Sequence, residues 1–105
     1  MALDATAMIR LDLRSPALRS RIINASPRGM LLVMPDARPI GTRIHVTVQL
    51  EGQAKDLPRE IRVDGIIVHC SVTENVDPRF SARAGILVTS QEPTWIELCN
   101  RLAAK

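Results

Sequence analysis

The sequence predicts a mainly β protein, a six-stranded antiparallel β-barrel that is followed by one C-terminal α-helix. Three observations lead to this fold class. Hydrophobic residues make up 46% of the 105 residues, which is enough for one core without disulfide or metal support. Several short segments alternate apolar and polar residues, and the last segment changes to a helical period. Short, regularly spaced strands are typical of closed barrels, so we expect residues 1–105 to form a single domain.

Three segments of the N-terminal half have strand character. Residues 8–13 alternate apolar and polar side chains from Ile9 onward and are followed by a Ser-Pro turn signal. Residues 18–23 form the second expected strand. Residues 24–29 have the composition of a tight turn. The third expected strand is the apolar run at residues 30–34.

The next three expected strands are residues 42–50, 60–70 and 83–89. The first of these has the strictest alternation in the chain, which predicts one buried and one exposed face. We expect it to pair antiparallel with residues 60–70, with His45 pointing outward. The core-facing side chains would be Ile44, Val46 and Val48.

The C-terminal segment has a helical period. Trp95, Leu98, Cys99 and Leu102 follow the spacing i, i+3, i+4, i+7 of an amphipathic helix. Pro93 suits the first turn, where its missing N–H costs nothing. We expect this helix to close one opening of the barrel or to cover one face through Trp95.

The sequence contains no pattern that is typical of an enzyme or a metal site. Ser26 lacks the context of a nucleophile elbow, and there is no phosphate-cradling glycine loop and no recognisable pair of catalytic carboxylates. Cys70, Cys99, His45 and His69 are scattered rather than spaced as metal ligands. We therefore expect a binding protein without a catalytic residue, metal or resident cofactor.

The basic residues are nearly all arginine. The net charge is +3, and every basic residue except Lys55 and Lys105 is Arg. A GC-rich coding bias would explain the ratio, whereas the planar guanidinium fork also suits phosphates and guanine edges. Residues 10–28 contain five of these arginines, Arg10, Arg14, Arg19, Arg21 and Arg28. The chain has no signal-peptide pattern and no apolar run long enough for a membrane span, which predicts a cytoplasmic protein.

The most informative local pattern is Asn24-x-Ser26-x-x-Gly29. The amide of Asn24 and the hydroxyl of Ser26 can bond the edge of a planar base. Gly29 would allow a ligand to approach the backbone closely. Taken alone, the six residues are better explained as a simple hairpin turn.

The wider sequence resembles the PilZ domain family over about residues 18–104. The Asn24–Gly29 motif and the apolar segment after it match the family's Asp/Asn-x-Ser-x-x-Gly motif and strand. Further segments resemble the family in order and spacing. They are Pro39-Ile40-Gly41-Thr42, Gly65-Ile66-Ile67-Val68, Ala84-Gly85-Ile86-Leu87-Val88 and the helix at residues 94–102.

The resemblance implies a six-stranded barrel with a C-terminal helix that binds cyclic di-GMP, a bacterial second messenger. In the family, an Arg-x-x-x-Arg pair contacts phosphate and guanine and precedes the first strand. Arg10 and Arg14 have this spacing, but Arg10 lies inside the expected first strand. The candidate ligand-binding residues are Arg10, Arg14, Asn24, Ser26, Arg28 and Gly29.

Three functions remain open from the sequence. The first is a cyclic di-GMP receptor. The second is a PilZ-type adaptor that has lost nucleotide binding and acts through a protein partner. The third is a small barrel that binds nucleic acid. The third is disfavoured because single-strand binders stack bases on exposed aromatic rings, and Phe80 and Trp95 are the only aromatic residues. The sequence predicts no particular oligomeric state.

Overall fold

The computed structural model describes residues 2–12, 14, 16–49, 59–72 and 80–103. They form six strands and one helix. These elements are β1 (Ala2–Arg10), β2 (Leu18–Ser26), β3 (Gly29–Met34), β4 (Arg43–Gln49), β5 (Glu60–Val72), β6 (Ala82–Val88) and α1 (Pro93–Ala103).

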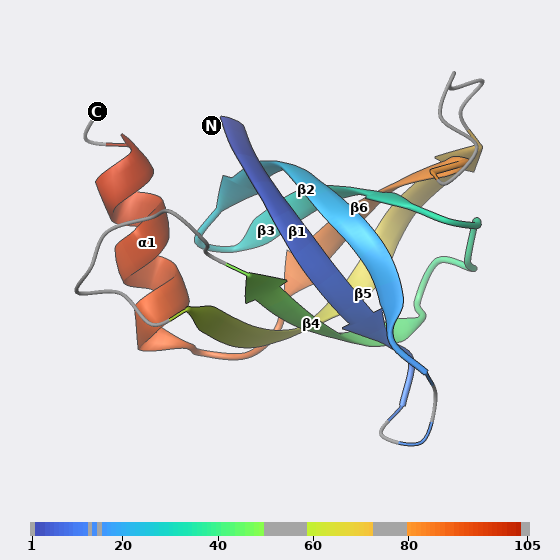
Figure 1. Ribbon diagram of the computed structural model, residues 1–105, viewed down its shortest axis with the longest axis horizontal. Helices are drawn as coiled ribbons and strands as arrows, with labels where there is room; N and C mark the ends of the chain where they lie inside the picture. The colour runs from blue at the N-terminus through green and yellow to red at the C-terminus, as the bar shows by residue number, and fades with distance from the viewer. Residues whose placement is uncertain (1, 13, 15, 50–58, 73–79, 104–105) are drawn as a thin grey trace.

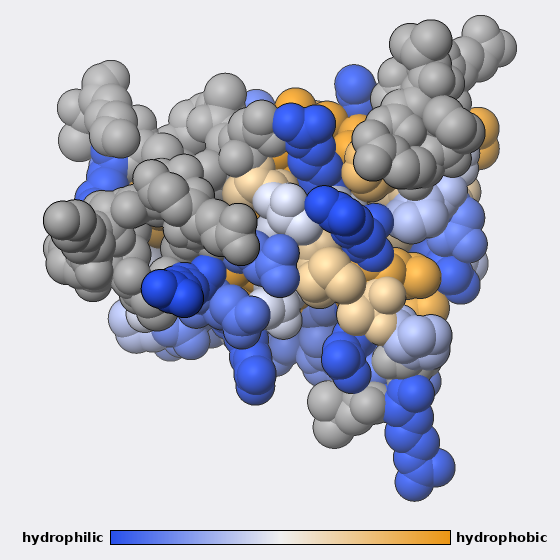
Figure 2. Space-filling model, in the orientation of Figure 1, coloured by the Kyte–Doolittle hydropathy of each residue, from blue (hydrophilic) through white to orange (hydrophobic). Residues whose placement is uncertain are grey.

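The six strands form a closed barrel in the order β1-β2-β3-β6-β5-β4, and every neighbouring pair is antiparallel (Figure 1). Closure gives every strand two neighbours, which is the physical reason that short strands favour this arrangement. The predicted fold class is confirmed. Both hydrophilic side chains and hydrophobic patches reach the surface over the barrel (Figure 2).

The pairing of β4 with β5 agrees with the prediction. Val46 lies opposite Val63, and Val48 lies opposite Ile61, so the inward positions of the two strands face each other. Ile44, Val46 and Val48 are buried, while His45 is exposed. The strict alternation of this segment therefore indicated both its structure and its orientation.

The first strand differs from the prediction. β1 begins at Ala2 rather than at residue 8 and ends at Arg10 rather than at residue 13. Ala5, Ala7 and Ile9 point inward and are buried. Alanine has a low strand propensity and contributes little to a period-two hydrophobic pattern, so pairing with β2 and β4 determines this strand. β2 and β5 likewise extend past their expected ends, to Ser26 and Val72.

Helix α1 closes the barrel on the side of the β2–β3 turn (Figure 1). Its first turn is capped by Glu92, whose side-chain oxygen accepts from Thr94 N at 3.3 Å and whose carbonyl accepts from Ile96 N at 3.1 Å. Trp95, Leu98 and Cys99 belong to the hydrophobic core of the barrel. The expected closing role of the helix is thereby confirmed.

Burial also affects the chemistry of this helix. It raises the pKa of the Cys99 thiol to about 11, so the group stays protonated and unreactive at neutral pH. Among the helices that the structure describes, none is long and apolar enough to cross a membrane.

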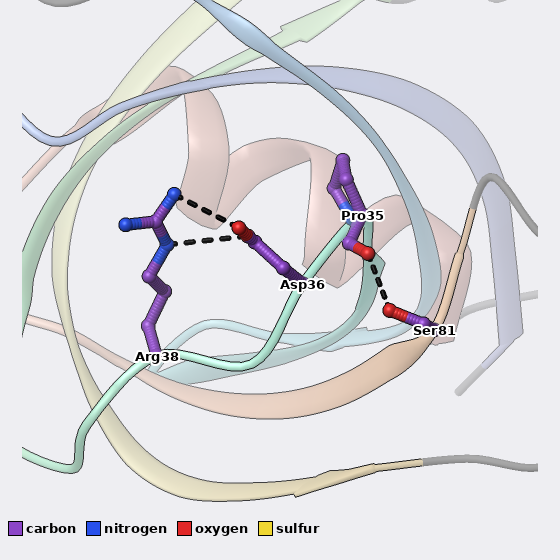
Figure 3. Close-up of polar contacts among 4 residues, drawn as sticks. All are labelled: Pro35, Asp36, Arg38 and Ser81. Atoms are coloured by element: carbon purple, nitrogen blue, oxygen red, sulfur yellow. Dashed lines mark hydrogen bonds and ion pairs between the residues drawn. The ribbon is translucent and has the colours of Figure 1, made fainter.

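The connection between β3 and β4 is held by polar contacts (Figure 3). The guanidinium of Arg38 donates from Nε and Nη2 to the two carboxylate oxygens of Asp36, each at 3.2 Å. Ser81, just before β6, donates its hydroxyl to the carbonyl of Pro35. This connection is therefore joined to the start of β6, at the barrel end away from the β2–β3 turn.

Candidate functional site

The β2–β3 turn brings Asn24, Ser26 and Gly29 together at one end of the barrel. Ser26 and Gly29 are the last pair of the hairpin, and the Ser26 hydroxyl donates to the Gly29 carbonyl at 3.3 Å. The Arg28 carbonyl accepts from Val88 N at 2.8 Å, which ties the turn to the end of β6. Pro27 supplies the fixed φ that suits the first central position of such a turn. The turn is thus held from both sides.

Gly29 has a packing role that the motif alone does not indicate. A Cβ atom at this position would lie 2.9 Å from the carbonyl oxygen of Ile86 in β6. The absence of a side chain at Gly29 therefore allows β3 to approach β6 closely. Glycine is the residue that such a distance requires.

Two cavities adjoin the turn. A small one of about 340 Å³ is lined by Asn24, Ser26, Gly29 and Leu31, among others. A larger one of about 1140 Å³ lies between the turn, the end of β6 and α1. Arg28 is exposed and lines the larger cavity, whose other lining residues include Leu87 and Ile96. The turn therefore borders a small hollow with a mixed polar and apolar lining and a larger hollow with a mainly apolar lining.

Arg10 and Arg14 do not join this turn. In the β1–β2 pair, Ile9 lies opposite Leu18, whereas Asn24 lies opposite Ala2. Six residues of β2 separate the two positions, which is about 20 Å at the rise of an extended strand. Arg10 and Arg14 are therefore near the β1–β2 connection, at the other end of β2 (Figure 1).

Arg14 instead lines a third cavity, of about 770 Å³, together with Arg43, His45 and Asp64. His45 and Asp64 are opposite each other in β4 and β5, and His45 Nδ1 lies 2.7 Å from the Asp64 carboxylate. The side chain of His45 is 47% exposed and that of Asp64 is 60% exposed. Sequence reasoning missed this pair, because only the strand register brings residues so distant in sequence together.

No site for a metal ion is found in the part of the chain that the structure describes, since no three His, Cys, Asp or Glu side chains gather there. Cys70 is partly buried and Cys99 is fully buried, and both are free thiols. At the β2–β3 turn, the polar side chains are the amide of Asn24, the hydroxyl of Ser26 and the guanidinium of Arg28. Groups of these kinds can bond an anionic, planar ligand.

Comparison with solved structures shows a protein of similar fold. No family model matches the sequence, and the curated proteins give no match either. Among solved structures, the fold is similar to the PilZ domain with c-di-GMP of YcgR from Escherichia coli, with a TM-score of 0.67 and 18% sequence identity. The alignment covers 94% of this chain and 78% of that chain. The closed barrel with its C-terminal helix is therefore a PilZ-like fold.

Proposed function

We propose that this domain is a receptor for cyclic di-GMP of the PilZ type, a binding module and not an enzyme. The observation that carries the proposal is the β2–β3 turn, where Asn24 and Ser26 are exposed beside a cavity and Gly29 closes the motif. The similar fold of a PilZ domain that was solved with c-di-GMP supports it. The proposal implies the cytoplasmic location that the sequence predicts.

The side chains of the turn have suitable hydrogen-bonding groups for a guanine edge. Asn24 is exposed, and an asparagine amide carries both hydrogen-bond donors and an acceptor. The Ser26 hydroxyl donates to the Gly29 carbonyl, and its oxygen keeps lone pairs that can accept from a base N–H. The exposed guanidinium of Arg28 adds a positive charge at the same end of the barrel. Together they suit a ligand that combines a base with a phosphate.

A second candidate function is a PilZ-type adaptor that binds a protein and no nucleotide. The position of Arg10 and Arg14 favours it, because the pair with the family's spacing lies about 20 Å along β2 from Asn24. The cavity of about 1140 Å³ beside α1, with its apolar lining, is a suitable place for a partner's side chains. This function predicts no binding of cyclic di-GMP.

The nucleic-acid function loses support from the burial of the aromatic residues. Trp95 is fully buried and Phe80 is partly buried, so neither offers an open ring for a stacked base.

We expect isothermal titration calorimetry of the folded wild-type protein to detect binding of cyclic di-GMP. The Ser26→Ala substitution should weaken the binding free energy by about 0.5–1.5 kcal/mol, the net contribution of a neutral hydrogen bond. Folding should be unchanged because the Ser26 side chain is exposed. At a hundred times the dissociation constant, the nucleotide should also stabilise the fold by about 2.7 kcal/mol. No binding at high micromolar nucleotide, with a folded protein, would reject the receptor and leave the adaptor.

A further inference from the structure

The outer face of β2, β3 and β6 carries two arginines that the motif does not include. Val33 of β3 lies between Arg21 of β2 and Arg83 of β6, as the direct partner of both. Side chains of directly paired residues point to the same face of a sheet. The Cα atoms of Arg21 and Arg83 are thus two strand spacings apart, about 10 Å.

These two arginines point away from the barrel core. Both are exposed, although Val33 between them is only 6% exposed. Val33 is not part of the core cluster, to which its neighbours Leu32 and Met34 belong. It is therefore a buried position on the outside of the barrel, flanked by two long basic side chains. Arginine stems can cover such apolar surface while their guanidinium groups stay in water.

A second row of directly paired residues, nearer the β2–β3 turn, belongs to the same outer face. Leu31 of β3 lies opposite Asn24 of β2 and Gly85 of β6, and Gly85 lies opposite His69 of β5. Asn24 and His69 are exposed. The row therefore has the amide of Asn24 at one end and the imidazole of His69 at the other. Between them lie Leu31 and Gly85, and Gly85 has no side chain.

Packing does not explain the glycine at this position. A Cβ atom on Gly85 would meet only the Cβ of His69, at 3.5 Å, which is an ordinary contact. Gly29 and Gly65 differ, because a Cβ there would lie 2.9 Å or less from neighbouring atoms. Positive φ does not explain it either, since Gly41 has the positive φ in the described part of the chain. The open centre of this row is left as a shallow surface where a flat group can lie against the strands.

We propose that this outer face is the phosphate-binding part of the nucleotide site, and that Arg21 and Arg83 bind the phosphates of a cyclic dinucleotide. One base then lies over Gly85 and Leu31, and the base edge reaches Asn24. The proposal rests on the proposed receptor function and extends it, because it assigns the phosphate contacts to residues other than Arg10 and Arg14. Those two lie beyond Leu18, at the far end of β2.

The test is calorimetry with cyclic di-GMP on the wild-type chain, Arg21→Ala and Arg83→Ala. Each substitution should weaken binding about 10-fold or more, because it removes charge-assisted hydrogen bonds. Arg62→Ala is the matched control, since Arg62 is an exposed strand arginine that lies opposite Thr47 in the β4–β5 pair. The control should bind as the wild type does.

Gly85→Val tests the same face without removing a charge. The branched side chain suits a strand, and its Cβ would make only an ordinary contact, at 3.5 Å with the His69 Cβ, so the protein should fold. It would occupy the open centre of the row, and we expect at least about a 10-fold loss of affinity, equivalent to one step of 1.4 kcal/mol.

The outcomes separate the two proposals. If the wild type binds and Arg21→Ala, Arg83→Ala and Gly85→Val all bind equally well, the outer-face site is wrong while the receptor function stands. Loss of binding in Arg10→Ala or Arg14→Ala, with Arg21→Ala unchanged, would also overturn it. If the folded wild type binds no cyclic di-GMP, both proposals fail together.

Discussion

Trp95→Ala should lower the free energy of unfolding by about 3–5 kcal/mol, the usual loss for a large buried aromatic residue. Trp95 is 0% exposed and is among the largest fully buried side chains of the barrel core. Its removal leaves a cavity between α1 and the strands that neighbouring side chains can fill only in part. The measurement is equilibrium denaturation in urea, followed by circular dichroism.

Two further variants make this result interpretable. Ile96→Ala changes the next residue of the same helix, which is 39% exposed, and should cost much less. Trp95→Phe keeps most of the apolar volume and removes the indole Nε1, which has no hydrogen-bond partner among the described residues. It should therefore be clearly more stable than Trp95→Ala. Equal stability of Trp95→Ala and the wild type would contradict the closing role of the helix.

Gly65→Ala should destabilise the barrel by about 1–3 kcal/mol, the usual cost of overpacking. A Cβ atom at this position would lie 2.5 Å from Ile86 Cγ2 and 2.9 Å from the Leu87 carbonyl oxygen. The second contact is with backbone, so β5 and β6 must separate to admit the methyl group. This overpacking cost should exceed the stabilisation of about 0.5–1 kcal/mol that alanine has over glycine within a strand.

Gly85→Ala is the matched control for this substitution. It lies on β6, and its Cβ would make only an ordinary contact at 3.5 Å. We expect this variant to be as stable as the wild type or slightly more stable. If thermal melts gave Gly65→Ala and Gly85→Ala the same stability, the close approach of β5 to β6 would be refuted.

The barrel was predictable where side chains alternate in size and polarity. Ile44, Val46 and Val48 indicate both a strand and its buried face, and Trp95 begins a clear helical stripe. The start of β1 was not predictable, because Ala5 and Ala7 are buried without a strong hydrophobic signal. Such a strand is set by its partners and not by its own propensity.

The candidate site was predictable only where its residues are close in sequence. Asn24, Ser26 and Gly29 come from one turn, so their spacing alone indicates that they lie together. Arg14 and Asn24 are also near in sequence, but an extended strand carries its two ends apart. Arg83 is the reverse case, because it is far from Arg21 in sequence. Only the pairing of β3 with β2 and β6 places the two arginines on either side of Val33.

The receptor function is tested most directly by a titration of the isotopically labelled protein with cyclic di-GMP, followed in backbone amide NMR spectra. We expect the largest shifts at Ser26 and Gly29 in the turn and at Leu31 and Gly85 on the outer face, with Arg43 unaffected beside its separate cavity. Saturation of these shifts at micromolar nucleotide would support a receptor. An unchanged spectrum of the folded protein would contradict the receptor function, and shifts that gather around Arg43 would contradict a site at the turn and the outer face.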